Sequence, residues 1–314
     1  MQFRTQVPIP AYDQLIDYDS RIVSLGSCFA VNIAEKFRYY KFQNILNPVG
    51  ILFHPLALEK FIRYAVEGHK FSDPDIFLHK DLWHSFDAHS DLSRTTKVQL
   101  LQDLNTSATS AKSAITEASH IIITLGTSWV YRHIESGELV ANCHKVPQNQ
   151  FSKELLSVSE NVESLQNIIE LLKSVNNNVH IIFTVSPVRH IKDGFVENQR
   201  SKAHLITALH EVLQSATAVY FPSYEIMMDE LRDYRFYSHD MLHPNQTAID
   251  YIWERFLEAA VSKGAFDTMQ EVDAVQKSLS HRAFNPESEQ HQQFLLKVQG
   301  QINHLQKKFP HIVF

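Results

Sequence analysis

Two kinds of segment alternate along most of the chain. Short, almost wholly apolar runs are typical of strands that are covered on both faces, and they occur at 22–25, 120–125, 179–185 and 218–221, with a weaker candidate at 44–46. Segments whose apolar residues lie three and four positions apart predict helices at 29–40, 56–66, 95–118, 160–175 and 199–215. Because strand and helix alternate about five times, the pattern predicts an α/β fold: a parallel sheet of about five strands with helices on both faces.

The remaining segments predict additions to this sheet. Residues 3–20 are expected to form an irregular arm, and 71–93, rich in aromatic residues, His, Asp and Ser, predicts a long loop or a short hairpin. Apolar residues at 130–134 and 139–142 flank a polar turn and predict a further hairpin. Asn245 is a plausible N-cap for another helix, and two more helical stretches follow Asp267. We expect one domain over 1–264 and a helical extension over 265–314 that packs on it.

Composition narrows the class of protein. The 314 residues are 44% hydrophobic and 20% charged, as expected of a globular chain that buries a large core. The formal net charge of −6 provides no basic footprint, so no nucleic-acid partner is expected. No apolar run approaches membrane-spanning length, and Met1–Thr5 lack the apolar region of a secretory signal. We therefore expect no membrane partner and a cytoplasmic location.

Cysteine and histidine usage predicts no metal centre. Cys28 and Cys143 are the two cysteines, and they lie too far apart in sequence to indicate a disulfide framework. The 18 histidines are scattered, with no metal-ligand spacing. Most histidines, His144 among them, are by default polar residues with ordinary partners. We expect neither a metal nor a cofactor.

The turn after the first predicted strand carries the first candidate chemistry. It contains Gly26, Ser27 and Cys28, and a helical pattern starts directly afterwards. Glycine permits a tight turn, and the amides of a helix N-terminus favour the negative charge of a thiolate or an oxyanion. The alternative is an ordinary strand-to-helix connection that contains a small buried cysteine.

The second candidate for catalytic chemistry is the sequence Asp240-Met241-Leu242-His243. A carboxylate three residues before a histidine can hold one ring nitrogen, which leaves the other nitrogen free to take a proton from a nucleophile. The alternative is a helix-capping aspartate beside an unrelated histidine. Because this segment follows the last predicted strand, we expect it at the same sheet edge as the Gly26 turn.

Several blocks together resemble the GSCFA-domain family. The naming block is Leu25-Gly26-Ser27-Cys28-Phe29-Ala30, and four further blocks follow in order: Asn47–Ile51, Gly126–Tyr131, Val140–Lys145 and Ser186–His190, before Asp240–Pro244. That family is similar by pattern to the SGNH/GDSL hydrolases, which are ester hydrolases and acyl transferases. The resemblance implies a flavodoxin-like, three-layer, SGNH-hydrolase-like fold.

The resemblance also implies roles for particular residues. It implies that Cys28 or Ser27 is the nucleophile, with His243 as base and Asp240 as its orienting acid. Gly50 matches the block whose glycine amide binds the oxyanion. Gly126 matches a block whose asparagine side chain also binds it, but that asparagine is missing here, and Thr127, Ser128 or Asn142 are the candidate replacements. His144 is a further candidate for substrate binding. Arg189 is another, because it follows a predicted strand and could bind a carboxylate or phosphate of the substrate; the alternative is a structural ion pair.

Three functions are compatible with these residues. The first is an SGNH-like esterase or acyltransferase that acts by covalent acyl transfer, with a small-molecule or carbohydrate ester as substrate. A sugar-stacking wall built from Trp83, His84, His89 and Trp129 would suit a carbohydrate, whereas packing is the alternative for the two tryptophans. The second is a catalytically silent binding protein, which the missing asparagine favours. The third is a thiol-dependent acyl enzyme, which requires Cys28 rather than Ser27 within hydrogen-bond reach of His243.

Overall fold

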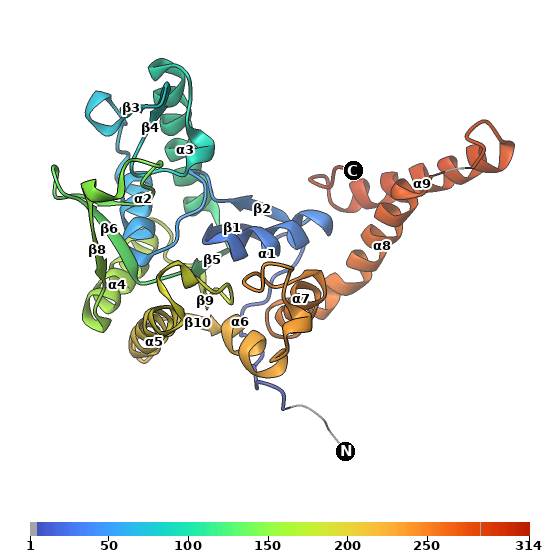
Figure 1. The fold of residues 1–314 in the computed structure, drawn as a ribbon. Helices are drawn as coiled ribbons and strands as arrows, with labels where there is room; N and C mark the ends of the chain where they lie inside the picture. Colours follow the sequence, from blue (N-terminus) through green and yellow to red (C-terminus); the bar gives the residue numbers. More distant parts are fainter. Residues whose placement is uncertain (1–4, 283) are drawn as a thin grey trace.

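A five-stranded parallel sheet forms the centre of the computed structural model, which describes residues 5–282 and 284–314. Its strand order is β10-β9-β5-β1-β2 (Figure 1). The five strands are β1 (Arg21–Gly26), β2 (Gln43–Leu46), β5 (His120–Leu125), β9 (His180–Val185) and β10 (Ala218–Phe221). In chain order this is the 2-1-3-4-5 arrangement of flavodoxin-like folds, so the predicted fold class is confirmed.

Nine helices are described. They are α1 (Cys28–Tyr39), α2 (Pro55–Glu67), α3 (Lys97–Glu117), α4 (Val158–Val175), α5 (Phe195–Val212), α6 (Ser223–Glu225), α7 (Gln246–Ala260), α8 (Lys263–Ser280) and α9 (Glu289–Lys308). Of these, α1 to α5 and α7 cover the two faces of this sheet. Ile121 and Ile123 of β5 belong to the core that α2 to α5 cover, whereas Ile122 belongs to the opposite core beneath α1 and α7. Side chains of a strand point alternately to its two faces, which explains why one apolar run supplies both cores.

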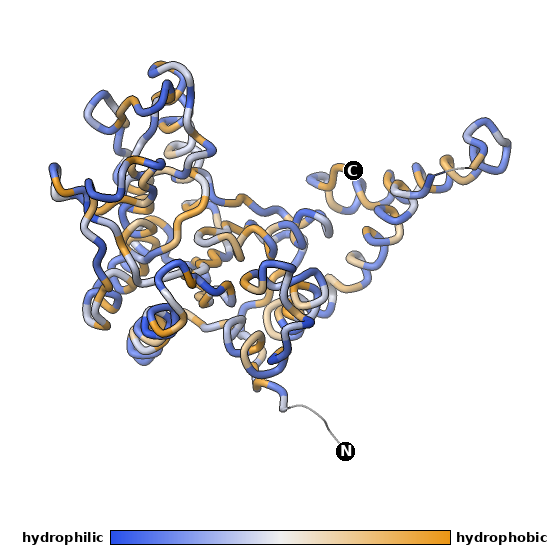
Figure 2. The backbone as a smooth tube through the Cα atoms, viewed as in Figure 1, coloured by the Kyte–Doolittle hydropathy of each residue, from blue (hydrophilic) through white to orange (hydrophobic). Residues whose placement is uncertain are grey.

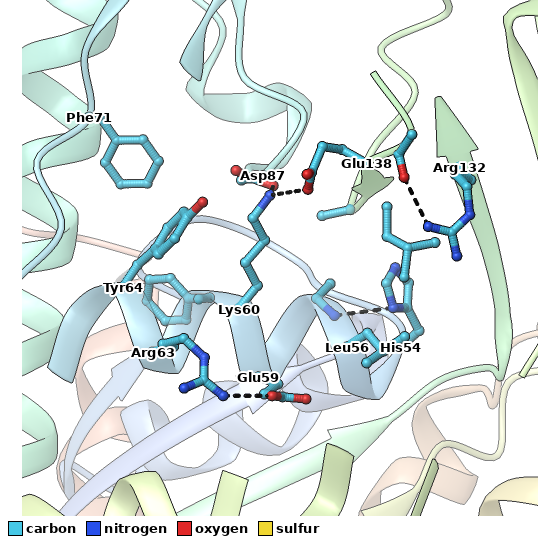
Figure 3. A pocket seen from close by; sticks show the side chains of 15 residues that line it. His54, Leu56, Glu59, Lys60, Arg63, Tyr64, Phe71, Asp87, Arg132 and Glu138 are labelled. Atoms are coloured by element: carbon cyan, nitrogen blue, oxygen red, sulfur yellow. Dashed lines mark hydrogen bonds and ion pairs between the residues drawn. The ribbon is translucent and has the colours of Figure 1, made fainter. Parts of the chain in front are cut away.

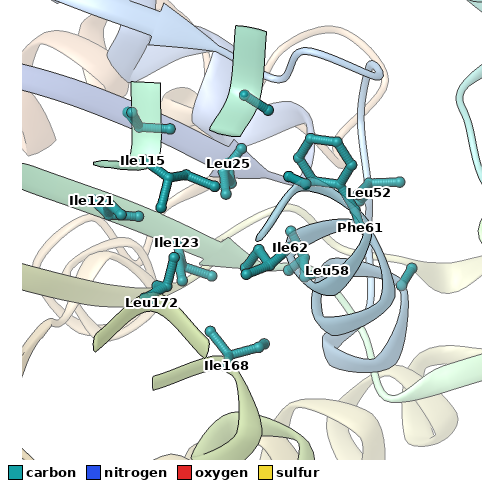
Figure 4. Packing of buried hydrophobic residues seen from close by; sticks show 14 of the residues in the cluster. Leu25, Leu52, Leu58, Phe61, Ile62, Ile115, Ile121, Ile123, Ile168 and Leu172 are labelled. Atoms are coloured by element: carbon teal, nitrogen blue, oxygen red, sulfur yellow. The ribbon is translucent and has the colours of Figure 1, made fainter. Parts of the chain in front are cut away.

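Figure 4 shows the first of these cores from close by. Ile121 and Ile123 share this core with Ile168 and Leu172 of α4 and with Phe61 of α2, and all five are buried. Complete burial of one such side chain contributes roughly 1.5–3 kcal/mol to folding, so the layered arrangement is held mainly by apolar contact. Along the backbone in Figure 2, hydrophobic segments concentrate around the sheet and hydrophilic ones at the periphery.

Two small antiparallel units are inserted before and after β5. The predicted loop or hairpin over 71–93 contains the hairpin β3 (Phe77–His79) and β4 (Leu82–His84). The predicted hairpin at 130–142 is present as β6 (Trp129–His133) and β7 (Leu139–Val140). A third strand, β8 (Phe151–Leu155), pairs with β6 on its other side and was not predicted.

The reason that β8 escapes sequence reasoning is its polar composition. Ser152, Lys153 and Glu154 form its middle, without an apolar stripe. The order of this strand comes from hydrogen bonds to β6 and from a two-point ion pair between Arg132 and Glu154, at 3.0 Å for each contact. Such tertiary pairing overrides local propensity.

The last two helices form a hairpin that projects from the sheet domain, drawn in red in Figure 1. The inner side of α8 places Met269, Val272 and Val275 in the same core as α7, and Val298 and Leu305 of α9 are also buried. The division of the chain at 264 stays a prediction. Residues 1–4, which include the start of the predicted arm, and residue 283 lie outside the described residues. Among the described helices none has the length and apolar content needed to cross a membrane.

Candidate active site

The turn after β1 approaches the neighbouring strand β5 so closely that only glycine fits. Gly26 has a φ of +126°, and a Cβ at this position would lie 2.1 Å from the carbonyl oxygen of Thr124. The side chain of Asn47 closes the turn from the other side, since its Oδ1 accepts from the Gly26 amide at 2.8 Å and its Nδ2 donates to the Gly26 carbonyl at 3.2 Å. The turn is therefore fixed from two sides at the junction of β1 and β5, where the chain reverses its direction across the sheet.

The two candidate nucleophiles at this turn have different surroundings. Ser27 is the N-cap of α1 and is fully buried, and its Oγ has no hydrogen-bond partner among the described residues. Cys28 is the first residue of α1 and is partly exposed. Its Sγ lies 3.9 Å from Nε2 of His243. The structure therefore brings Cys28, and not Ser27, to the histidine.

His243 in turn contacts the predicted aspartate. Its Nδ1 lies 2.7 Å from Oδ2 of Asp240, while Oδ1 of Asp240 accepts from the amides of Leu242 at 2.9 Å and His243 at 3.1 Å. These two amides and the imidazole hold the pKa of Asp240 well below its ordinary value, although the carboxylate is exposed. A persistent carboxylate on Nδ1 favours the tautomer in which Nε2 is free to accept a proton from Cys28.

Opposing influences act on the Cys28 thiol. Burial raises its pKa and outweighs the cation of Lys202 and the amides of Cys28 and Phe29, which lower it, so the pKa of the thiol is raised overall. The amides belong to the first turn of α1, where N–H groups have no partner within the helix. The same two amides can donate to negative charge that develops beside the sulfur.

Gly50 lies in the loop after β2, as expected, but its amide is engaged. The amide donates to the carbonyl oxygen of Asn47 at 2.8 Å. Its φ is +79°, and a Cβ there would lie 2.3 Å from Cβ of His89, so glycine is required for packing. We therefore do not carry Gly50 forward as an oxyanion donor.

The residues after β5 are also fully engaged in local structure. The amides of Gly126 and Thr127 both donate to the carbonyl oxygen of Phe53, at 2.8 and 3.0 Å. Thr127 and Ser128 bind Ser201: the two Oγ atoms of Thr127 and Ser201 are 2.9 Å apart, and the Ser128 amide donates to Ser201 Oγ at 2.7 Å. In this structure Gly126, Thr127 and Ser128 therefore join the β5 loop to its neighbours.

The side chains of the other three predicted binding residues have partners away from Cys28, Asp240 and His243. Asn142 accepts from the amide of His144 at 2.8 Å, and Nε2 of His144 lies 2.6 Å from the Ser85 carbonyl, within the inserted units. Arg189 lies closer to the site, because its amide donates to the carbonyl of Leu242 at 3.2 Å. Its guanidinium stacks over Tyr237 and donates to the hydroxyl of that ring at 2.8 Å. Arg189 thus holds the loop that carries His243 through contacts to Leu242 and Tyr237.

Sequence reasoning missed three polar residues on the inner face of α5. Asn198 accepts from the amide of His190 at 2.9 Å, Ser201 holds the β5 loop, and Lys202 donates to the carbonyls of Gly126 and Ser186. All three are buried in line with Leu205. The spacing of three and four residues was visible in the sequence, and a lysine within an apolar stripe could have indicated an unusual cation.

His190 is a second unusual group at this edge. Its Nε2 is buried without a hydrogen-bond partner among the described residues, and its ring meets Phe53 edge-on with centroids 5.8 Å apart. Burial, with additional contributions from the charges of Lys202 and His243, lowers the pKa of His190 to about 3. The imidazole is therefore neutral near pH 7 and offers a polar ring atom near the other groups.

Comparison with known proteins adds a family to this geometry. The family model described as "GSCFA family" matches residues 21–256, which include every element of the sheet and the three residues that contact one another. This chain belongs to the GSCFA family. A second model, "GSCFA domain protein, C-terminal domain", matches residues 272–314. A search of curated proteins found no match.

Solved structures similar to this GSCFA chain include three esterases. A carbohydrate esterase family 3 protein from Talaromyces cellulolyticus has 11% identity and a TM-score of 0.29, over 52% of this chain and 66% of that one. A serine-to-alanine mutant of an acetyl esterase, with acetate ion, has 11% identity and a TM-score of 0.32, over 82% and 99%. An acetyl xylan esterase from Butyrivibrio proteoclasticus has 11% identity and a TM-score of 0.34, over 84% and 66%.

The aromatic residues considered for a sugar wall are spread over separate elements. Trp83 lies in β4 beneath the ammonium of Lys97, and Trp129 in β6 lies beneath that of Lys153 while its Nε1 donates to the carbonyl of Glu197. His84 is buried in the first insertion, where its Nδ1 lies 2.6 Å from Ser93 Oγ. His89 adjoins a residue of the predicted site, through its contact with Gly50.

A cavity of about 280 Å³ lies elsewhere, between α2 and the inserted strands (Figure 3). Lys60 extends into it and pairs with Asp87 at 2.8 Å and with Glu138 at 3.6 Å. His54 at its edge caps α2, with Nδ1 accepting from the Ala57 amide at 3.1 Å. Cys28, Asp240 and His243 do not line this cavity. Within residues 5–282 and 284–314 no cluster of three or more His, Cys, Asp or Glu residues is arranged to hold a metal ion.

Proposed function

We propose that this GSCFA protein is an SGNH-like, thiol-dependent acyl-transfer enzyme, an esterase or acyltransferase. Cys28 is the nucleophile, His243 the general base and Asp240 the residue that orients it. The observation that supports this most strongly is the chain of contacts from Cys28 Sγ to His243 Nε2, at 3.9 Å, and from His243 Nδ1 to Asp240 Oδ2, at 2.7 Å. A nucleophile, a base and an orienting acid in this order are the parts that acyl transfer requires.

The reaction proceeds in two halves. In the first, His243 takes the proton of Cys28, sulfur bonds to the acyl carbon of an ester, and the C–O bond to the alcohol breaks as the imidazolium protonates the departing oxygen. In the second, His243 takes a proton from water or from an acceptor alcohol, whose oxygen bonds to the acyl carbon. The C–S bond then breaks and the thiol regains its proton. Both halves balance without an added cofactor.

The oxyanion of each half is held by backbone amides in this proposal. The N–H groups of Cys28 and Phe29 already act on the sulfur from the first turn of α1. Removal of one such donor costs about 100- to 1000-fold in rate in other hydrolases. The amide of Gly50 and the side chains of Thr127, Ser128 and Asn142 have other partners, so the missing asparagine is not simply replaced by one of them.

Ser27 is the matched alternative and is less well placed. Ser27 is 0% exposed. It packs against Gly126 so closely that a Cβ added at Gly126 would lie 3.1 Å from Cβ of Ser27. A substrate carbonyl cannot approach an atom without solvent access unless the turn opens. The thiol-dependent hypothesis requires Cys28 within hydrogen-bond reach of His243. The distance of 3.9 Å between Cys28 Sγ and His243 Nε2 supports it.

The proposed substrate is an ester of a short acyl group. Asp240 and His243 are exposed and Cys28 is partly exposed, which suits a small acyl group delivered from solvent by a larger alcohol. An acylated carbohydrate is one alcohol of this kind. Because Trp83 and Trp129 already pack under lysines, we do not assign them to sugar binding.

Hydrolysis of p-nitrophenyl acetate by four purified proteins tests this proposal. Wild type is compared with Cys28→Ala, Ser27→Ala and His243→Ala, and folding is verified by circular dichroism. We expect activity to be lost in Cys28→Ala and His243→Ala and to be retained in Ser27→Ala. Intact-mass spectrometry of the wild type after rapid acid quench is expected to detect one acetyl group, absent from Cys28→Ala. Retention of full activity in folded Cys28→Ala would overturn the assignment.

A further inference from the structure

The side chain of Arg189 lies against two tyrosines of the segment that leads to His243. Its guanidinium carbon is 4.1 Å from the ring centroid of Tyr237 and 5.2 Å from that of Tyr234. The two ring centroids are 5.8 Å apart, and the rings are tilted by 47° to each other. Contact with aromatic faces favours a guanidinium and fixes its plane. The position of this cation is therefore set by packing on both rings.

The hydrogen bonds of the Arg189 guanidinium go to neutral hydroxyl groups. Nη2 donates to the hydroxyl of Tyr237 at 2.8 Å, and Nη1 donates to that of Tyr234 at 3.4 Å. The other N–H groups of the planar fork have no acceptor among residues 5–282 and 284–314. Because Arg189 is partly exposed, a solute has access to it. The fork thus keeps donors for a ligand.

The lack of a carboxylate partner separates Arg189 from most arginines of the described chain. The arginines that form an ion pair with Asp or Glu are Arg21, Arg38, Arg63, Arg94, Arg132, Arg200, Arg232, Arg235 and Arg255. Apart from Arg189, only Arg282 has none within the described residues, and Arg282 is exposed to water. A partly buried cation without a counter-ion favours an anion at the same place.

Contacts on both sides of His243 connect Arg189 to the candidate site. Its amide donates to the carbonyl oxygen of Leu242, which directly precedes His243, at 3.2 Å. Its partner Tyr237 forms an antiparallel bridge with Pro244, which directly follows His243. The cation is therefore held by the same loop as the histidine, and an ester that reaches His243 has this charge as a neighbour in the loop.

We propose that Arg189 is a substrate-binding residue of this site and selects esters that carry a second, anionic group, a carboxylate or a phosphate. Its remaining donors bind the oxyanion by charge-assisted hydrogen bonds. The effect on catalysis rests on the proposed function, but binding of the anion is measured without turnover. The substrate class is thereby narrowed to a short acyl ester whose alcohol bears a negative charge.

Modification by phenylglyoxal tests anion binding in the unaltered protein. Peptide mapping by mass spectrometry measures the rates at Arg189 and at Arg235, a control in the same segment that pairs with Asp233 at 3.0 Å. We expect 4-hydroxybenzoate to slow modification of Arg189 by about tenfold, and the neutral 4-hydroxybenzamide to have little effect. Phenyl phosphate is the second anionic probe, and the anion that protects at the lower concentration identifies the preferred group. Lack of protection by both anions, equal protection by the neutral amide, or equal protection of Arg235 would overturn the proposal.

The effect on catalysis is measured as the ratio of kcat/KM for 4-acetoxybenzoate to that for the neutral 4-acetoxybenzamide. Arg189→Gln is expected to lower this ratio by about tenfold, and Arg189→Lys, which keeps the charge without the fork, to lower it less. The control Arg235→Gln is expected to change it by less than about twofold, because its partner is an exposed carboxylate. A general disturbance of the His243 loop lowers both rates alike and leaves the ratio unchanged.

The outcomes separate this proposal from the proposed function. An unchanged ratio in folded Arg189→Gln overturns anion selection. If the variants do not fold, protection from phenylglyoxal decides alone, since it uses the unaltered chain. If the wild type hydrolyses neither ester, acyl transfer is contradicted, whereas protection of Arg189 still decides whether the site binds an anion.

Discussion

The surroundings of the two cysteines show what makes a thiol a candidate nucleophile. Cys28 and Cys143 are both partly exposed, and burial raises the pKa of each. At Cys143, which packs beside Val140 and Phe151 of the inserted sheet, only the charge of Lys192 opposes burial, and the pKa rises to about 11. At Cys28 two helix amides and Lys202 oppose burial, and a histidine lies 3.9 Å away. Similar exposure therefore provides little guidance, and the difference lies in the charges and donors around the sulfur.

The largest expected effect is the loss of acyl transfer on removal of one of these thiols. Cys28→Ala is expected to lower kcat/KM for p-nitrophenyl acetate by about 1000-fold or more, because it removes the proposed nucleophile. The matched Cys143→Ala is expected to stay within about twofold, because Cys143 is not part of the chain of contacts from Cys28 through His243 to Asp240. Equal losses in two folded variants would remove the distinction between the cysteines.

A smaller loss is expected when the histidine near Cys28 loses its carboxylate. Asp240→Asn is expected to lower kcat by about 100-fold, because an amide does not hold Nδ1–H and the imidazolium as a carboxylate does. Asp267→Asn on the exposed side of α8 is the control. Folding lowers the pKa of Asp240 below its ordinary value of 3.8. The hydrogen bonds that the carboxylate accepts therefore stabilise the folded protein at any pH above 3.8, and this stabilisation is lost only as the pH falls from 3.8 towards the lowered pKa. The wild-type pH–rate profile between pH 5 and 8 is therefore not expected to show the titration of Asp240, and a loss of less than threefold in Asp240→Asn would contradict its role.

The third effect is a pH-dependent loss of folding stability caused by His144, the residue that follows Cys143. Burial lowers the pKa of His144 to about 4, from 6.5 in the unfolded chain. The neutral form is favoured by folding, so stability is complete above pH 6.5 and declines as pH falls towards 4. Between pH 7 and 5 we expect a loss of about 2 kcal/mol from this group. Urea unfolding at both pH values measures it, with a smaller loss expected in His144→Gln than in the wild type.

The smallest effect is a difference in alkylation rate within one protein. At pH 8, native Cys28 is expected to react with iodoacetamide about tenfold faster than Cys143, because its thiolate is better stabilised. Peptide mapping by mass spectrometry after short exposure measures both sites at once. In 8 M urea the two rates should converge, since the helix amides and the buried cation are lost on unfolding. A native rate ratio near one would show that the charges around Cys28 have little effect on its sulfur.

The sequence by itself predicted the alternation of buried strands and amphipathic helices, and hence the class of fold. It also predicted the Gly26–Cys28 turn and the pairing of Asp240 with His243. These features are local: an apolar run, a glycine before a helix, and a carboxylate three residues from a histidine are each written within a few positions. The flavodoxin-like fold was implied by the family resemblance, whereas the order of the strands comes from the structure.

Only the tertiary structure decided which candidate nucleophile contacts the histidine, because the choice between Ser27 and Cys28 depends on the direction of two adjacent side chains at one helix N-terminus. The structure also shows that Gly50 and Thr127 form hydrogen bonds within the protein, to Asn47 and Ser201. It shows as well that the ion pair with Arg132 holds β8 in place. Lys202 is the clearest case: on the sequence it is one of 29 basic residues, and only folding buries its ammonium between the carbonyls of Gly126 and Ser186. Contacts between segments far apart in the chain depend on packing and desolvation, which local pattern does not specify.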